Sequence, residues 1–156
     1  MAKRFILVVV VLLLAALGAC QTSTQTFSVE NVWARSSVAG GNSAIYMTIN
    51  NPTAQDDVLL SAQSSVANAV ELHLSSVDAN GVMSMKQQEN IPVPANSMVE
   101  LKPGGLHVML IGLPNDLKVG DEFEVTLNFK NAGAITLKVP VKDAADAMEH
   151  KMPMQP

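Results

Sequence analysis

The chain has 156 residues, and its 14 acidic residues outnumber its 10 basic ones, for a net charge of −4 with histidine neutral. This acidic balance argues against a nucleic-acid ligand, because binding to phosphates depends on clustered Lys and Arg side chains. The chain has one cysteine, which excludes an internal disulfide, so stability must come from a hydrophobic core.

The first twenty residues, MAKRFILVVVVLLLAALGAC, have the parts of a bacterial secretory signal. Lys3 and Arg4 give a basic start, and an apolar run and then small residues lead to Cys20. The apolar run, residues 5–16, is shorter than the ~20 residues that a membrane-spanning helix needs. A cleaved signal is therefore predicted, with an uncleaved anchor as the alternative.

The end of this segment, LGAC, resembles the bacterial lipobox, in which the signal is cut before a cysteine that becomes lipid-modified. We expect residues 1–19 to be a lipoprotein signal peptide and Cys20 to be the lipidation site. A chance cysteine after an ordinary signal is the alternative. The lipid would hold the protein in a membrane on the bacterial periplasmic side. Gln21 stands where an aspartate commonly retains lipoproteins in the inner membrane, which favours the outer one.

A polar stretch, residues 20–26, has no apolar periodicity and is predicted to be a tether. A single domain is expected over 27–142, since that length is typical of one domain. Short segments rich in Val, Ile and Leu alternate there with turn-forming clusters such as AGGN and DANG, and no long helical pattern occurs.

The two-residue period of β-strands is clearest in EFEVTLNF and AITLKVPV, which are joined by a predicted hairpin turn, KNAG, with Gly133 able to take positive φ. Pro140 indicates that the second of these strands lies at a sheet edge. The other strands are predicted near residues 28–35, 43–50, 57–63, 68–75, 82–87, 97–101 and 106–112. This series of short strands predicts an all-β, antiparallel β-sandwich.

Histidine and methionine gather in three of the predicted strands. His107 and Met109 are one residue apart in KPGGLHVMLIGL, so strand alternation places both side chains on one face. In AVELHL the same alternation puts His73 on a face with Glu71, and across the DANG turn Met83 and Met85 share a face of the next strand. The opposite, core face of AVELHL is formed by Val70, Leu72 and Leu74. A cluster of two imidazoles and one or two thioethers is geometrically plausible.

Thioether sulfur is a soft, neutral ligand that binds Cu(I) well and hard ions poorly, and imidazole adds affinity without negative charge. Copper is therefore the metal that this set predicts. A blue-copper electron-transfer site also needs a cysteine thiolate, which the domain lacks, so carrying copper is favoured over cycling electrons. The alternative is structural, because methionine often fills gaps in cores; Met47 is assigned to the core in this way, and Met98 has no assigned role.

The spacing of these residues closely resembles that of the periplasmic copper chaperones of the PCuAC type, which share His-Met, ten residues, Met, twenty-one residues and His-x-Met. Here residues 75–84 separate Leu74 from Met85, and residues 86–106 separate Met85 from the His-Val-Met triplet at 107–109. The resemblance extends over about residues 27–142 and includes these segments: VWAR at 32–35, NSAIYMTI at 42–49, VELH at 70–73, GVMSM at 81–85 and ELKPGGLHVMLIGL at 100–113.

The resemblance implies a cupredoxin-like antiparallel β-sandwich with Greek-key connections. It also implies four copper ligands: His73, Met85, His107 and Met109. Met83 is the reserve candidate if the strand register differs. The family often has Met after its first histidine, where this chain has Leu74; since that position falls on the core face, no ligand is expected to be lost.

By the same resemblance, the protein is a non-enzymatic Cu(I) metallochaperone that delivers copper to the copper-site subunit of a respiratory cytochrome c oxidase, alongside a Sco-type chaperone. A copper-buffering protein without a dedicated recipient would use the same residues and is the alternative. The tail, residues 143–156, is expected to be flexible, and His150, Met152 and Met154 are a possible secondary site for Cu(II) or Cu(I). A solvated tail is an equally good interpretation of that segment.

Overall fold

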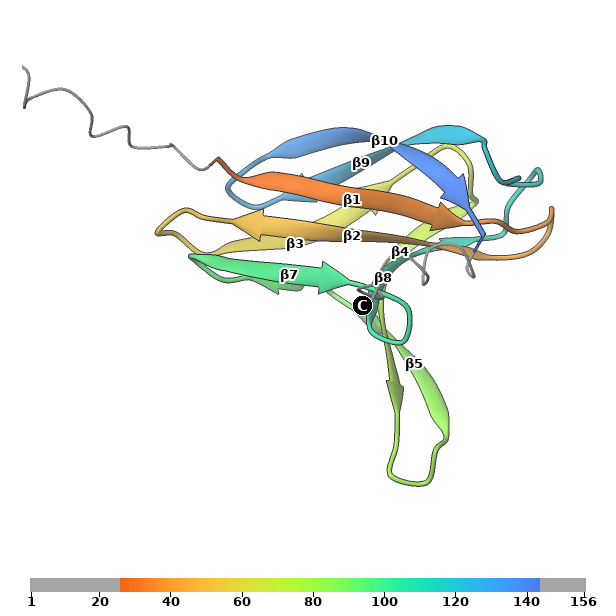
Figure 1. Cartoon of the computed structure of the whole chain (residues 1–156), viewed down its shortest axis with the longest axis horizontal. Helices are drawn as coiled ribbons and strands as arrows, with labels where there is room; N and C mark the ends of the chain where they lie inside the picture. Colours follow the sequence, from red (N-terminus) through yellow and green to blue (C-terminus); the bar gives the residue numbers. More distant parts are fainter. Residues whose placement is uncertain (1–25, 144–156) are drawn as a thin grey trace, which may run out of the picture.

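The structure is a computed structural model that describes residues 26–143. This part of the chain contains only β-strands and their connections (Figure 1). The strands are β1 Ser28–Arg35, β2 Ser43–Asn51, β3 Asp57–Gln63, β4 Ala69–Val77, β5 Met83–Gln88, β6 Ile91–Val93, β7 Ser97–Leu101, β8 Leu106–Ile111, β9 Glu122–Phe129 and β10 Ala134–Lys142. Within residues 26–143, no helix has the length and apolarity needed to cross a membrane. The all-β prediction is confirmed.

Nine of the ten strands form one hydrogen-bonded path, in the order β5-β4-β8-β2-β1-β10-β9-β3-β6, and β7 pairs with β2. The pairs are antiparallel except β1 with β10, which run parallel over two residue pairs. The path curls so that both of its halves bury apolar side chains in one shared core (Figure 1).

The core follows from strand alternation. In β9, Val125 and Leu127 have no exposed surface, while Thr126 between them points to the opposite face and is half-buried. In β2, Ile45 and Ile49 are fully buried beside Met47, which is 2% exposed. The assignment of Met47 to the core is therefore confirmed.

The predicted hairpin between β9 and β10 is confirmed. Gly133 has a φ of 79°, and the Phe129 N–H donates to its carbonyl at 2.9 Å. The buried carboxylate of Asp57 accepts the backbone N–H groups of Asn131 at 2.9 Å and Ala132 at 2.8 Å. One side chain of β3 thus fixes the turn of the neighbouring hairpin.

The prediction that Pro140 marks an edge strand is wrong, because β10 lies between β9 and β1. The pairing with β1 includes only Val141 and Lys142. The Val141 N–H donates toward β9, to the carbonyl of Asp121 at 2.8 Å. Since backbone N–H groups alternate sides along a strand, the nitrogen of Pro140 faces β1 just before that pairing starts. No ladder hydrogen bond is lost there.

The strand β6, three residues long, was not predicted, because Pro92 interrupts its apolar pattern. Pro92 pairs with Val58 while its neighbours Ile91 and Val93 point into the core, with exposed fractions of 1% and 0%. β6 lies at the end of the hydrogen-bonded path, where a proline is tolerated.

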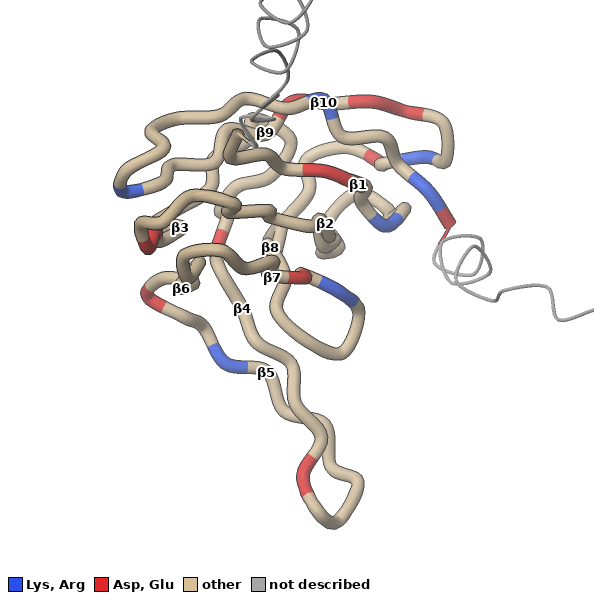
Figure 2. Tube along the Cα trace, turned by 60° about the vertical axis from the view of Figure 1, so that its left-hand side comes forward, with Lys and Arg blue, Asp and Glu red and all other residues tan. Residues whose placement is uncertain are grey.

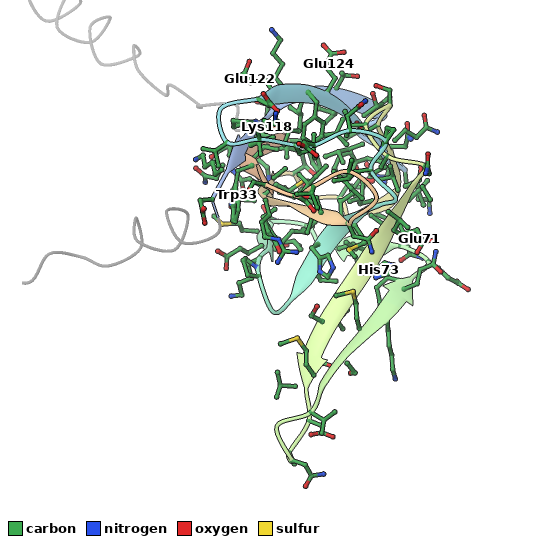
Figure 3. All side chains as sticks on the ribbon, turned by 90° about the vertical axis from the view of Figure 1, so that its right-hand side faces the viewer. Trp33, Glu71, His73, Lys118, Glu122 and Glu124 are labelled. Atoms are coloured by element: carbon green, nitrogen blue, oxygen red, sulfur yellow. The ribbon has the colours of Figure 1, made fainter. Side chains whose placement is uncertain are left out.

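The hairpin of β4 and β5, residues 69–88, extends well beyond the body of the domain and is called the arm below (Figures 1 and 3). Its turn is closed by Asp78, which accepts the N–H groups of Asn80 and Val82 at 2.8 and 2.9 Å. β5 pairs with β4 alone. The expectation that Leu74 is a core residue is wrong: it shares a face with buried Leu72 but is 37% exposed, because the arm has left the core at that point.

Candidate metal centre

Two histidines from neighbouring strands meet where the arm joins the body. The antiparallel register of β4 and β8 places His73 directly opposite His107. Their ring centroids are 5.8 Å apart, and the ring planes are inclined at 54°. The register between β4 and β8 therefore brings together the two rings that alternation assigned to non-core faces.

The predicted thioethers lie on the same face, one row to either side. Met109 on β8 pairs with Glu71 on β4, and Met85 on β5 pairs with Ser75 on β4. Because residues two apart on a strand point to the same side, both methionines emerge on the face that carries His73. Met109 is half-buried, whereas Met85 is 48% exposed on the arm.

The reserve candidate, Met83, pairs with Val77 one further row along the arm. It is 69% exposed, and the whole row of Met85 and Ser75 separates it from the histidines. The register thus places Met83 farther from the imidazoles than Met85.

His73 is held by a carboxylate and leaves one nitrogen without a partner. Its Nε2 lies 2.7 Å from Oε2 of Glu71, two residues earlier on β4 (Figure 3). Its Nδ1 is buried and has no hydrogen-bond partner in the described part of the chain. A buried polar atom without a partner destabilises a fold, so this nitrogen points to a ligand. Sequence reasoning put Glu71 on the face of His73 and gave it no role.

His107 is held by the main chain instead. Its Nδ1 donates to the carbonyl of Gly105 at 3.0 Å, and Ser75 N–H donates to the same carbonyl at 3.0 Å. His107 is 3% exposed. Burial lowers the pKa of His107; nearby His73 and Arg35 lower it further, against the opposing effect of the Gly105 hydrogen bond. A neutral imidazole with its proton on Nδ1 presents the lone pair of Nε2.

Two aromatic residues continue the row beyond His107, and sequence reasoning did not identify them. The ring of Tyr46 on β2 is 6.3 Å from the His107 ring, and Trp33 on β1 is 4.6 Å from Tyr46. Burial raises the pKa of Tyr46, with a smaller opposing effect of Arg35, so its phenol stays neutral. The alternation that buries Met47 on the opposite side was the available signal for Tyr46 in the sequence.

Glu71 is the charged side chain that contacts the histidine pair. Among residues 26–143, no three His, Cys, Asp or Glu side chains come together as a metal site would require. Figure 2 shows the charged residues spread over the body, with few on the arm. Thioether sulfur selects soft ions, so Met85 and Met109 are the candidate donors beside the two histidines.

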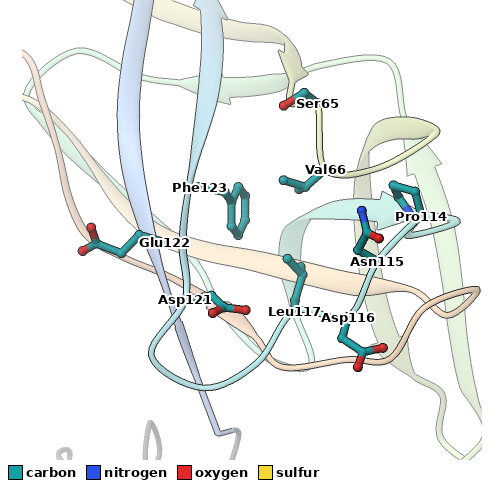
Figure 4. Close-up of a pocket in the computed structure, with 9 residues that line it drawn as sticks. All are labelled: Ser65, Val66, Pro114, Asn115, Asp116, Leu117, Asp121, Glu122 and Phe123. Carbon is teal, nitrogen blue, oxygen red and sulfur yellow. The ribbon is translucent and has the colours of Figure 1, made fainter.

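A separate pocket of about 280 Å³ lies between the loops beside β9 (Figure 4). Its lining contains neither histidine nor methionine: Ser65, Val66, Pro114, Asn115, Asp116, Leu117, Asp121, Glu122 and Phe123. The carboxylates of Asp116 and Asp121 accept the backbone N–H groups of Ala39 and Lys118, so they hold loops. We assign this pocket no part in metal binding.

Several predicted residues lie outside the described range. These are the lipidation site and the tail residues of the possible secondary site: Cys20, His150, Met152 and Met154. Their roles stay predictions.

Comparisons with known proteins identify chains that are similar to this one. The family model described as "Putative lipoprotein LpqE-like" matches residues 27–141. A curated relative, "Putative lipoprotein Lxx21020" of Leifsonia xyli subsp. xyli, is 32% identical over 123 residues, which are 78% of this chain and 73% of the relative.

Two similar solved structures contain copper by their own descriptions. The "Copper-bound PCuAC domain from PmoF2" has 28% identity and a TM-score of 0.63, with 75% of this chain and 92% of that domain covered. The Cu(I) form of DR1885 from Deinococcus radiodurans has 27% identity and a TM-score of 0.62, with 81% and 86% covered. The expected PCuAC-type, cupredoxin-like fold is confirmed.

Proposed function

Because this chain belongs to the LpqE-like family and to the PCuAC type of copper chaperone, we propose that it binds one Cu(I) ion and passes it to a partner. The proposed ligands are His73, Met85, His107 and Met109. The observation that carries the proposal is the facing pair of imidazoles, 5.8 Å apart between ring centroids, beside a buried His73 Nδ1 that has no partner in the described residues.

The chemistry of this set suits a carrier of Cu(I). Two neutral imidazoles and two thioethers leave the ion with its single positive charge, and soft sulfur discriminates against hard cations. In an oxidising compartment a thiolate site would be exposed to disulfide formation, a risk that thioethers do not share. Copper would move by exchange of its ligands, with no covalent bond of a substrate formed or broken, so the protein is proposed to be non-enzymatic.

The position of Met85 supports transfer. It lies on β5, which pairs only with β4, and it is 48% exposed, whereas His107 is 3% exposed. A donor from a recipient can therefore approach the copper from the Met85 side and replace that thioether first. The two histidines would hold the ion until the new bonds have formed.

For the cellular setting we propose a lipoprotein anchored through Cys20 on the periplasmic side, with the outer membrane favoured by Gln21. Residues 1–19 would be the signal, 20–26 the tether, 27–142 the copper-binding domain and 143–156 a tail with a secondary site. The proposed recipient is the copper-site subunit of cytochrome c oxidase, with a Sco-type chaperone as co-partner.

Anaerobic Cu(I) titration against a competing chelator tests the site. We expect one tightly bound ion in the wild type and a large loss of affinity in the Met85→Ala, Met109→Ala double variant. Met98→Ala is the matched control, since Met98 is 66% exposed on β7, away from the histidines. Equal affinity in the wild type and the double variant would remove the thioether site. A truncation before residue 143 tests the tail, which contributes nothing if copper stoichiometry is unchanged.

The alternative is a copper buffer with no dedicated recipient, which the same residues would serve. Deletion of the gene separates the two functions. Loss of oxidase activity that added copper rescues identifies the chaperone, whereas copper sensitivity with normal respiration identifies the buffer.

A further inference from the structure

Glu71 is the side chain that forms a hydrogen bond with His73. Its Oε2 is 2.7 Å from His73 Nε2, and the two side chains are 31% and 14% exposed. Figure 3 shows both at the base of the arm. An ionised carboxylate can accept hydrogen bonds but has no proton to donate. The proton of a neutral His73 therefore lies on Nε2, and its lone pair lies on Nδ1, the buried nitrogen without a partner.

Resting on the copper site proposed above, we infer that Glu71 is a positioning residue that directs Nδ1 of His73, rather than Nε2, to copper. Glu71 does this by accepting the hydrogen bond of Nε2, which also fixes the orientation of the imidazole ring. Partners of this kind set the tautomer and the orientation of a metal-binding histidine and raise its basicity.

Glu71 itself is not proposed as a ligand. Carboxylate oxygen is a hard donor and a poor match for Cu(I). Its Oε2 is already engaged by His73, and its place in the register is opposite Met109, whose thioether is the better donor. The contribution of Glu71 to copper binding therefore passes through His73.

The two histidines would then bind copper through different nitrogens. His107 is oriented by a backbone carbonyl at its Nδ1, which leaves Nε2 for the metal. His73 is oriented by a side chain at its Nε2, which leaves Nδ1. The difference is useful experimentally, because a substitution can remove the partner of His73 while the partner of His107 remains as an internal reference.

Imidazole ¹⁵N NMR of the full chain at about pH 8 tests the inference directly, since Cu(I) is diamagnetic. On Cu(I) loading of the wild type, we expect the shift change at Nδ1 for His73 and at Nε2 for His107. In Glu71→Ala we expect loss of the Nδ1 selectivity at His73 only, with a fall in Cu(I) affinity of roughly 10- to 100-fold. Glu71→Gln retains an acceptor oxygen and should keep Nδ1 binding with a smaller fall.

Glu124→Ala is the control, because Glu124 is an exposed residue on β9, on the body of the domain (Figure 3). It should keep wild-type shifts and affinity. Thermal unfolding of the copper-free variants shows whether Glu71→Ala is folded, and a merely structural role would lower the melting temperature without changing the nitrogen bound. Copper on Nε2 of His73 in the wild type, or unchanged affinity with Nδ1 binding in Glu71→Ala, overturns the inference. Absence of Cu(I) binding in the wild type overturns the proposed function instead.

Discussion

The arm allows copper binding to be separated from folding through one side chain. Full burial of a Met side chain stabilises a fold by about 1.5–3 kcal/mol. Met85 is 48% exposed on β5, so Met85→Ala should lower the stability of the copper-free protein by about 1.5 kcal/mol at most. The same change removes one of the proposed sulfur ligands. The variant should fold almost normally and bind copper poorly.

The size of the effect follows from linkage between binding and folding. Free Cu(I) at 100 times the dissociation constant stabilises the folded state by about 2.7 kcal/mol. A domain of this size gains about 4 °C in melting temperature per kcal/mol, so the wild type should gain about 10 °C. Loss of an outer-sphere partner weakens metal sites by roughly 10- to 100-fold, and loss of a ligand should do at least as much. At the same free copper, Met85→Ala should then gain only about 2–6 °C or less.

Differential scanning calorimetry under anaerobic conditions, with Cu(I) buffered by a chelator, measures both quantities. Met98→Ala should retain the full copper-induced shift, because Met98 lies on β7 and is 66% exposed. Equal shifts in the wild type and in Met85→Ala would refute the assignment of Met85. A reduced shift in Met98→Ala would show instead that copper binds thioethers without regard to place.

Three further predictions concern the copper-free fold. Burial raises the pKa of Asp57, but hydrogen bonds from backbone N–H groups outweigh this effect and hold the pKa below its usual range. The ionised carboxylate therefore stabilises the fold above about pH 4, and this stabilisation is lost at lower pH. In urea unfolding, Asp57→Asn should lower the free energy of unfolding by about 1–3 kcal/mol at pH 7 and by much less at pH 2. Burial lowers the pKa of His107, so as the pH drops below about 6.5 this histidine is protonated more readily in the unfolded chain than in the folded one, and stability falls. Between pH 7.5 and 5.5, the urea midpoint of His107→Gln should change less than that of the wild type. Gly112 and Gly133 both have positive φ, so an alanine at either position strains the backbone by roughly 1–2 kcal/mol. A Cβ at Gly112 would also lie 2.9 Å from Asn68 Nδ2, whereas a Cβ at Gly133 would meet no atom within 4 Å. Thermal unfolding should therefore show a larger loss of stability in Gly112→Ala than in Gly133→Ala.

Local patterns were enough to predict most of the strands. Alternation located β9 and β10 with their turn, because both have a buried and an exposed face and Gly133 supplies positive φ. It did not locate β6, because the central residue of this three-residue strand is a proline, Pro92. Nor did it show that Pro140 is tolerated inside the sheet, because this depends on the pairing of β10 with β1 starting only at Val141, which the local sequence does not specify.

The candidate site was predictable in part for the same reason. Alternation assigned His73 and His107 to non-core faces, but only the register between β4 and β8 shows that they are directly opposite. The contact of Glu71 with His73 is local in sequence and still was not predicted, because a glutamate two residues before a histidine on a strand is usually solvated. The partners of a side chain follow from rotamers and burial, which a sequence pattern does not specify.

The division of the site between body and arm gives a physical reason for its architecture. His107 and Met109 lie on β8, inside the sheet between β4 and β2, where hydrogen-bonded neighbours on both sides hold the backbone. Met85 lies on an edge strand of a projecting hairpin, where one ladder alone restrains it. Regions with fewer packed neighbours open at lower free energy, so the weakest support falls on the ligand that is also most exposed. In the proposed site, His73, His107 and Met109 lie on β4 and β8, which each have a paired strand on both sides, so these three donors would hold the ion while the Met85 thioether exchanges.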